Sequence, residues 1–291
     1  MKQSNNQVGE KVLVLGAGQL GASVLASLVP AVTQRNGSVC VIVSGRSRDK
    51  QSKRRSSIHQ QLADAGARFI PVDIADSSVA ALKDQFHGFD TIINCMGFVA
   101  GAGTQIKITR AVLEAGVKRY FPWQFGVNYD VVGKGSGQPV WVIVSTGLFT
   151  SFLFEPAFDM VNLAKKTINA LGGWERQVTV TSPADIGRLT TEIYLHQPRI
   201  TNEVVFVAGE TTSYAKLAET VERVTQQTFT RGVLTLPDLQ EQLRLHPHDP
   251  MLRYRVAFAR GDGMWWPMSD TWNVQHHLPT QDIAAWLKTQ Q

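Results

Sequence analysis

The chain has 291 residues, 43% of them hydrophobic and only 18% charged, which is enough apolar material for a full core and excludes a mainly disordered protein. The formal net charge of +5 suits an anionic ligand but is too small to predict nucleic-acid binding by itself. The two cysteines lie inside apolar runs, which predicts buried thiols rather than a disulfide framework. The N-terminal stretch is polar and no apolar run reaches about 18 residues, so we expect a cytoplasmic protein without a membrane span.

The first half of the chain alternates short β-rich runs with helical patterns. Strands are expected at Lys11–Leu15, Val39–Ser44, Arg68–Val72, Thr91–Asn94, Arg119–Pro122 and Val140–Ser145. Helices are expected at Leu20–Gln34, Ile58–Ala65, Ser77–Phe86 and Thr104–Ala115. Strands that are apolar on both faces and separated by helices predict a parallel sheet covered on both sides. Residues 1–150 are therefore predicted to form an α/β domain, a Rossmann-type doubly wound parallel sheet.

The second half is less regular and is expected to form a smaller lobe over residues 151–291, interleaved with the sheet edge. Strands are expected at Gln177–Val180 and Glu203–Val207. Helices are expected at Tyr214–Gln226, Leu236–Leu245 and Asp282–Lys288. Ser182 or Asp185 is expected in the N-cap region of a further helix, a structural role. A lobe in this position would cover a cofactor and form the substrate pocket.

The turn after the first expected strand carries three glycines in the spacing G-x-G-x-x-G. Gly16 permits the tight turn, Gly18 lets the backbone approach a pyrophosphate, and Gly21 lets the helix pack closely on the strand. The helix N-terminus stabilises the anion. The phosphate site is therefore predicted at Gly16, Gly18, Gln19, Leu20 and Gly21.

The end of the second expected strand selects the form of the cofactor. A unit that prefers NAD would place Asp or Glu there to hold the ribose 2′-hydroxyl. This chain instead has Arg46, Ser47 and Arg48, and residues 44–57 carry six basic residues and one acid. Two guanidinium groups suit a 2′-phosphate, so NADP(H) is the expected cofactor. The alternative is an ordinary solvated basic loop.

Two further strand ends complete the predicted cofactor site. Asp73 and Ile74 follow the third strand and are expected to flank the adenine, although Asp73 would serve equally as a cap for the next helix. Cys95, Met96 and Gly97 follow the fourth strand, and their backbone is expected beside the nicotinamide ribose.

Several stretches together resemble the NmrA-like branch of the atypical short-chain dehydrogenases, which includes the isoflavone reductases and phenylcoumaran benzylic ether reductases. They are GAGQLG, the basic GRSR, VKRYFPWQFG at Val117–Gly126, and the later stretches Val142–Pro156 and Val178–Ile193. The resemblance implies an NADP(H)-binding Rossmann domain with a small C-terminal substrate lobe. Enzymes of this branch reduce phenolic or quinone-like substrates, and its other members are redox-sensing regulators without turnover.

The chain departs from this family pattern near the expected nicotinamide. Trp123 and Gln124 stand where the branch typically has Ser-Glu, which changes the polarity of a wall that also includes Phe125. The reductases carry their general acid, a lysine, on the helix after strand five, whereas Gly126–Gln138 contains four glycines and no helical face. The expected helix is thus deleted or replaced by a loop. The Tyr-x-x-x-Lys pair of ordinary short-chain dehydrogenases is absent.

A reductase needs a proton donor beside the nicotinamide and a pocket for its substrate. Lys134, the only lysine between strands five and six, and Tyr129 are the candidate donors. Their alternatives are a surface lysine and a packed loop aromatic. Phe149 and Phe152 are expected to line an aromatic substrate slot, unless they are ordinary core residues.

A metal site is not expected, because the adjacent His276 and His277 point apart on a regular element and have no carboxylate cluster beside them. The favoured function is an NADPH-dependent reductase of an aromatic or conjugated small molecule. The alternative is a non-catalytic NADP(H) sensor that regulates a protein partner, and a third, lesser option is an enzyme of cyclisation or isomerisation. No nucleic-acid or membrane partner is expected, whereas a homodimer and a regulatory protein partner stay open.

Overall fold

A computed structural model describes residues 9–44, 52–97, 101, 103–123 and 141–290. The chain divides into two compact units, which are described separately. The first comprises Met1–Trp123, Gly137–Ile143 and Ile186–Val204, and the second comprises Gln124–Ser136, Val144–Asp185 and Val205–Gln291. Among the described residues, no helix is long and apolar enough to cross a membrane.

The first unit is built on a parallel sheet of five strands in the order β3-β2-β1-β4-β5. The strands are β1 (Lys11–Leu15), β2 (Ser38–Val43), β3 (Arg68–Pro71), β4 (Thr91–Asn94) and β5 (Arg119–Phe121). In the central register, Val14 pairs with Val41 on β2 and with Ile93 on β4. The side chains of Val12–Leu15 are fully buried because helices cover both faces of the sheet. The predicted Rossmann-type α/β fold is confirmed.

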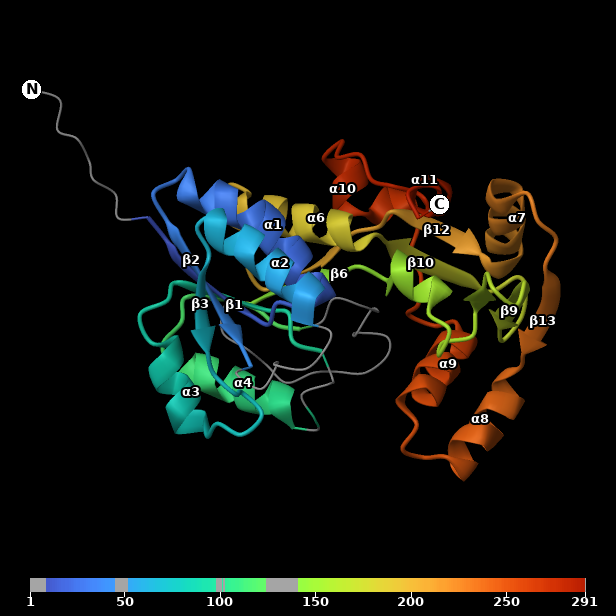
Figure 1. Ribbon diagram of the computed structural model, residues 1–291, viewed down its shortest axis with the longest axis horizontal. Helices are drawn as coiled ribbons and strands as arrows, with labels where there is room; N and C mark the ends of the chain where they lie inside the picture. Colours follow the sequence, from blue (N-terminus) through green and yellow to red (C-terminus); the bar gives the residue numbers. More distant parts are fainter. Residues whose placement is uncertain (1–8, 45–51, 98–100, 102, 124–140, 291) are drawn as a thin grey trace, which may run out of the picture. The chain divides into compact units, whose positions relative to one another are not determined.

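Helices cover both faces of this sheet (Figure 1). α1 (Gln19–Thr33) and α2 (Ser52–Asp64) lie on one face, and α3 (Val79–Phe86) and α4 (Thr104–Glu114) on the other. From β1 the chain proceeds through β2 to β3 at one edge, and from β4 to β5 at the other, so the topological switch point of this doubly wound sheet lies between β1 and β4. α3 begins after Ser78, whose side chain accepts a hydrogen bond from the Ala81 N–H at 3.1 Å. Asp73 is therefore not the cap of this helix.

A fifth helix, α6 (Pro183–Leu195), joins the first unit from Ile186 onward. The predicted cap is confirmed, since the Ser182 hydroxyl accepts a hydrogen bond from the Asp185 N–H at 3.1 Å. α6 lies beside α1 (Figure 1), and Gly187 makes their close approach possible. A Cβ at Gly187 would lie only 2.1 Å from the main-chain oxygen of Ser23.

Arg119, at the start of β5, fixes the C-terminal end of α6. It is 2% exposed, and its guanidinium donates to the main-chain oxygen of Tyr194 at 2.7 Å and to those of Ile193 and Ile200 at 3.3 Å each. Burial lowers its pKa to about 10, so it stays charged at neutral pH. The cation thus satisfies carbonyl groups that the end of a helix leaves unpaired.

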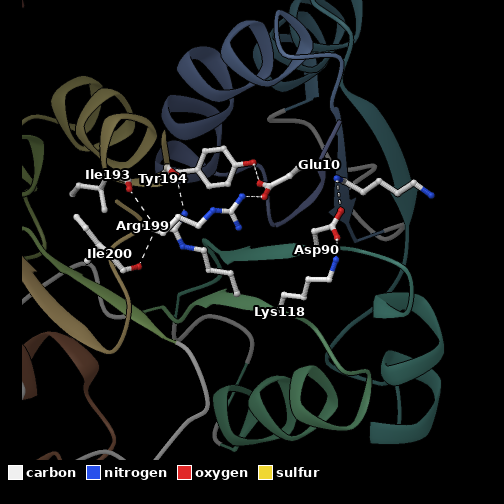
Figure 2. A network of polar contacts seen from close by, with 9 residues as sticks. Glu10, Asp90, Lys118, Ile193, Tyr194, Arg199 and Ile200 are labelled. Atoms are coloured by element: carbon white, nitrogen blue, oxygen red, sulfur yellow. Dashed lines mark hydrogen bonds and ion pairs between the residues drawn. The ribbon is translucent and has the colours of Figure 1, made fainter. Parts of the chain in front are cut away.

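Two carboxylates tie other segments to the amino-terminal edge of the same sheet (Figure 2). Glu10, just before β1, pairs with Arg199. Asp90, just before β4, accepts the Lys11 N–H at 2.9 Å and the Lys118 ammonium at 2.7 Å. The Lys11 N–H and then Lys118 hold the pKa of Asp90 below its ordinary value of 3.8. These contacts lie at the end of the sheet opposite the glycine-rich turn.

The second unit contains two small sheets, ordered β12-β10-β7 and β13-β9-β8. Their strands are β7 (Leu148–Phe149), β8 (Val161–Asn162), β9 (Thr167–Leu171), β10 (Gln177–Thr181), β12 (Glu210–Ser213) and β13 (Thr230–Leu234). Its helices are α7 (Tyr214–Thr225), α8 (Leu236–Leu245), α9 (Pro250–Arg260), α10 (Trp272–Gln275) and α11 (Ile283–Lys288), with 3-10 turns at Thr150–Phe154 and Met268–Asp270. Buried side chains such as Phe158, Leu217 and Phe258 form its own core. The remaining strands, β6 (Val142–Ser145) and β11 (Glu203–Phe206), each run across a boundary between the units.

Candidate cofactor site

The glycine-rich turn leads directly from β1 into α1. Gly16 has φ +90°, a left-handed conformation that favours glycine, and its N–H donates to the main-chain oxygen of Ile42 at 2.9 Å. A Cβ at Gly21 would lie 2.0 Å from the main-chain oxygen of Gly16. Gly21 therefore lets the first turn of α1 rest on the end of β1, as its spacing predicts.

Gly18 has the opposite surroundings. It is the residue that precedes α1, with φ −72°, and no heavy atom lies within 4 Å of the position that a Cβ would take. The first turn of α1 contains no acidic side chain. The first N–H groups of any helix lack partners within the helix and carry its positive dipole end, so this opening suits an anion.

The two other residues of the turn that were predicted to bind the phosphates, Gln19 and Leu20, differ in exposure. Gln19 is exposed, whereas Leu20 is 5% exposed and its side chain belongs to the core. Leu20 can therefore contribute to an anion site only through its backbone. The same holds for Ile74, which follows β3 and is 2% exposed.

The ends of β2 and β3 meet through side chains. The Ser44 hydroxyl lies 3.4 Å from a carboxylate oxygen of Asp73, and the main-chain oxygen of Asp73 accepts from the Ser77 hydroxyl at 2.7 Å. Asp73 is half-buried. The residues predicted to hold the 2′-phosphate, Arg46, Ser47 and Arg48, lie outside the described residues.

At the end of β4, the chain passes directly beside the glycine-rich turn. The Cys95 N–H donates to the main-chain oxygen of Leu15 at 2.9 Å, and the Cys95 Cβ lies 3.4 Å from the Cβ position of Gly21. Burial raises the pKa of the Cys95 thiol far above its ordinary value, so the thiol packs and does not ionise. The Met96 Cγ lies 3.0 Å from the Cβ position of Gly16.

Trp123 follows β5 and faces the end of β4. Its ring atom Cζ2 lies 3.5 Å from the position that a Cβ would take on Gly97. Both residues are half-buried. The structure thus brings together three of the predicted cofactor positions, Met96, Gly97 and Trp123, at the carboxyl ends of β4 and β5.

Sequence reasoning missed a set of amide contacts behind these positions. Asn94, which is fully buried, donates to the Gln105 side-chain oxygen at 2.7 Å and to the Tyr120 hydroxyl at 3.2 Å, and accepts from the Met96 N–H at 3.0 Å. The Gln105 amide donates to the main-chain oxygen of Met96 at 2.6 Å. The available signal was a polar Asn94 at the end of an apolar strand, which is costly to bury unless it is hydrogen-bonded.

The remaining predicted residues fall into two groups. Lys134, Tyr129, Gln124 and Phe125 lie outside the described residues. Phe149 and Phe152 belong to the second unit, where Phe149 is half-buried at the end of β7 and the Phe152 ring lies 4.8 Å from that of Phe158 and 5.9 Å from that of Tyr254.

The two cysteines and the histidine pair also have defined surroundings. Cys40 and Cys95 are free and buried, as predicted. The His276 ring stacks on Trp272 with 4.2 Å between ring centroids. Within the described ranges, no group of three or more His, Cys, Asp or Glu side chains is arranged to hold a metal ion.

A five-stranded parallel sheet with a glycine-rich turn at its switch point is the architecture of the Rossmann-type α/β proteins. The model of the NmrA-like family matches residues 9–143. An NmrA-like family domain-containing oxidoreductase of Gibberella moniliformis is 37% identical over 300 residues, covering 97% of this chain and 98% of the relative. The chain belongs to the NmrA-like family. The isoflavone reductase homolog IRL of Zea mays is 24% identical and covers 87% of each chain.

Solved structures share the fold over nearly the whole chain. An isoflavone reductase matches with a TM-score of 0.73 and 16% identity, covering 97% of this chain and 100% of that one. The NADPH-dependent quinone oxidoreductase QOR2 of Escherichia coli, complexed with NADPH, matches with a TM-score of 0.70 and 20% identity, covering 96% and 99%. AtPrR2 with NADP+ and (+)pinoresinol matches with a TM-score of 0.71 and 14% identity, covering 97% and 98%.

Proposed function

We propose that this chain binds NADP(H) and is an NADPH-dependent oxidoreductase that reduces an aromatic or conjugated small molecule. The observation that carries the proposal is the turn from Gly16 to Gly21, where Gly18 leaves the N-terminus of α1 open at the switch point of the sheet. The related fungal protein is named an oxidoreductase, and structures of the same fold contain NADPH or NADP+.

In this proposal, the adenosine half of the cofactor lies over β2 and β3. Arg46, Ser47 and Arg48 bind the 2′-phosphate, and Asp73 with the backbone of Ile74 flanks the adenine. The end of β2 carries no acid that would repel a phosphate, because Ser44-Gly45-Arg46-Ser47-Arg48 contains none. Two guanidinium groups can bind a phosphate in a bidentate manner.

The nicotinamide half runs past Cys95, Met96 and Gly97 toward Trp123, Gln124 and Phe125. When bound, NADPH supplies the hydride. The chain has to exclude water and supply a proton, for which Lys134 and Tyr129 are the candidates. Phe149 and Phe152 line the substrate slot in this proposal, which suits an aromatic ligand, and a protein of the same fold was solved with pinoresinol.

A titration with NADPH and NADH tests the cofactor step. We expect NADPH to bind more tightly, and an Arg46→Ala variant to lose about 10- to 100-fold in NADPH affinity with unchanged NADH affinity, because only NADPH carries the 2′-phosphate. Equal affinity of the wild-type chain for both cofactors would refute the assignment of NADP(H).

Turnover is tested separately with NADPH and a panel of quinones and conjugated phenolics, followed at the absorbance of reduced nicotinamide. Consumption of NADPH that falls in a Lys134→Ala or Tyr129→Phe variant would support the reductase and identify its donor. The second candidate function, a sensor of NADP(H) that regulates a protein partner, is favoured by the sequence of Gly126–Gln138, whose four glycines predict a loop where the reductases carry a lysine-bearing helix. Tight NADPH binding without turnover across the panel would select the sensor.

A further inference from the structure

The segment that leaves β4 is held by side-chain amides rather than by the sheet. The last bond of the β1–β4 ladder here is the one from the Cys95 N–H to the main-chain oxygen of Leu15. One residue later, the Met96 N–H donates to Asn94 Oδ1 at 3.0 Å and the Met96 carbonyl accepts from Gln105 Nε2 at 2.6 Å. Both main-chain polar groups of Met96 are thus bound by side chains, and this sets the direction of the chain toward Gly97.

The two side-chain amides also bind each other, and neither can exchange the positions of its oxygen and nitrogen without losing these hydrogen bonds. Asn94 Nδ2 donates to Gln105 Oε1 at 2.7 Å and to the Tyr120 hydroxyl at 3.2 Å. A flip of either amide would set a donor against a donor or an oxygen against an oxygen. Tyr120 is 2% exposed and burial raises its pKa to about 12, so its hydroxyl stays neutral. The contacts join β4, α4 and β5, and each buried polar atom named here has a partner.

These amides position Met96 and Gly97, which face the nicotinamide in the function proposed above. Met96 packs against the Cβ position of Gly16 at 3.0 Å, and Gly97 packs against the Trp123 ring at 3.5 Å. A displacement of Met96 by a few tenths of an ångström would alter both contacts. The adenosine side, over β2 and β3, has no bond to this network among the described contacts.

We propose that Asn94 and Gln105 are positioning residues that hold Met96 and Gly97 in the path required by the nicotinamide half of the cofactor. This inference rests on the proposed NADP(H) binding. Asn94 and Gln105 act through the main chain of Met96, and Tyr120 supports Asn94 from β5.

The test compares two probes, NADPH and 2′,5′-ADP, which carries the adenosine 2′-phosphate but no nicotinamide. We expect Gln105→Met to weaken NADPH binding about tenfold, because it removes the donor to the Met96 carbonyl while keeping the side-chain length. The affinity for 2′,5′-ADP should stay within about twofold of the wild type. The fluorescence of bound NADPH should also change, since the surroundings of the nicotinamide change.

A second variant keeps the test decisive if Gln105→Met folds poorly. Gln105→Glu keeps the oxygen that accepts from Asn94 but sets a carboxylate oxygen against the Met96 carbonyl. Once protonated, the carboxyl group can again donate to that carbonyl. Relative to the wild type at each pH, NADPH affinity of Gln105→Glu should therefore recover as the pH falls from about 8 to about 6. The matched control is Arg110→Gln, at an exposed position of the same helix, which should bind both probes like the wild type.

The outcomes separate this proposal from the function on which it rests. Selective loss of NADPH affinity in the Gln105 variants, with 2′,5′-ADP binding retained, supports the positioning role. If the wild-type chain binds NADPH, two results overturn the positioning role and leave the proposed NADP(H) binding intact. One is an equal loss of affinity for both probes in the Gln105 variants, and the other is no loss of affinity in these variants. Failure of the wild-type chain to bind either probe overturns the proposed function itself.

Discussion

Two glycines of the same turn are predicted to respond in opposite ways to the same substitution. A methyl group at Gly21 would lie 2.0 Å from the main-chain oxygen of Gly16 and 2.8 Å from its carbonyl carbon. A methyl group at Gly18 would have no heavy atom within 4 Å. Gly21→Ala should therefore damage the fold, whereas Gly18→Ala should damage only the binding of an anion at the N-terminus of α1.

The size of the first effect follows from the overlap. A carbon–oxygen contact of 2.0 Å has to open by more than 1 Å, and the obstacle is main chain that cannot turn aside. Overpacking of this kind typically costs about 1–3 kcal/mol, and we expect about 3 kcal/mol for Gly21→Ala because backbone has to move. For a protein of this size that corresponds to a fall in Tm of about 6–12 °C.

The second effect is on binding alone. The φ of −72° at Gly18 is accessible to alanine, so Gly18→Ala should change the free energy of unfolding by less than about 0.5 kcal/mol. NADPH at 100 times its Kd should stabilise the wild type by about 2.7 kcal/mol, and most of this gain should be absent in Gly18→Ala, since the methyl group fills the space through which a pyrophosphate approaches.

Thermal unfolding with and without NADPH measures both quantities for each variant. Circular dichroism follows the fold, and fluorescence titration gives the NADPH affinity. The reasoning is refuted if Gly18→Ala lowers Tm as far as Gly21→Ala, or if Gly18→Ala retains the full increase in Tm on addition of NADPH.

Three further predictions concern contacts within the first unit. Gly187→Ala should lower the free energy of unfolding by about 3 kcal/mol, because its methyl group would meet the main chain of α1 2.1 Å away, and chemical denaturation with urea should show this as a lower midpoint. Arg119→Met should cost about 3–5 kcal/mol, because it removes the donor to two buried carbonyls at the end of α6, those of Ile193 and Tyr194, and to the Ile200 carbonyl beyond it; an unchanged urea midpoint would contradict this. Asp90 has a lowered pKa, so its contribution to stability is present above its unfolded value of 3.8 and is lost as the pH falls through the lower folded value. The Tm difference between wild type and Asp90→Asn should accordingly shrink below pH 4, and a difference that grows there would count against the assigned contacts.

Element types in the first unit could be predicted because hydrophobic periodicity is local. The expected strands Lys11–Leu15 and Thr91–Asn94 have the bounds that the structure shows. The start of the second helix was placed too late, at Ile58 instead of Ser52, because the polar run before Ile58 has no apolar period.

Most misses lie in the second unit, where strands are short and half-buried. β9 and β13 were not predicted, because the alternation of polar and apolar residues in β9 covers only Thr167–Ala170 and β13 shows none. α9 was also missed, although its ends carry local signals. Asp249 caps its first turn with hydrogen bonds from the Met251 and Leu252 N–H groups, Pro250 follows, and Gly261 ends it in a left-handed conformation. The information was in the capping residues and not in the periodicity.

The candidate site also has one part that the sequence predicted and another that it did not. Glycine spacing predicted the turn at Gly16–Gly21, because each glycine answers a local steric demand. The contacts of Asn94 with Gln105 and Tyr120 could not be predicted, since these residues belong to three elements whose distances depend on how the sheet and α4 pack. The same holds for Trp123, which reaches Gly97 only because β4 and β5 are neighbours.

The sequence by itself determined the fold class of the protein, a parallel sheet covered by helices, with a glycine-rich turn after its first strand. These features follow from period, turn chemistry and residue size, all of which act over a few neighbouring residues. Only the tertiary structure decided that Asn94 and Gln105 hold the end of β4, and that residues 186–204 pack with the first unit. The physical reason is that these properties depend on distances between segments far apart in the chain, which close packing sets and no local pattern encodes.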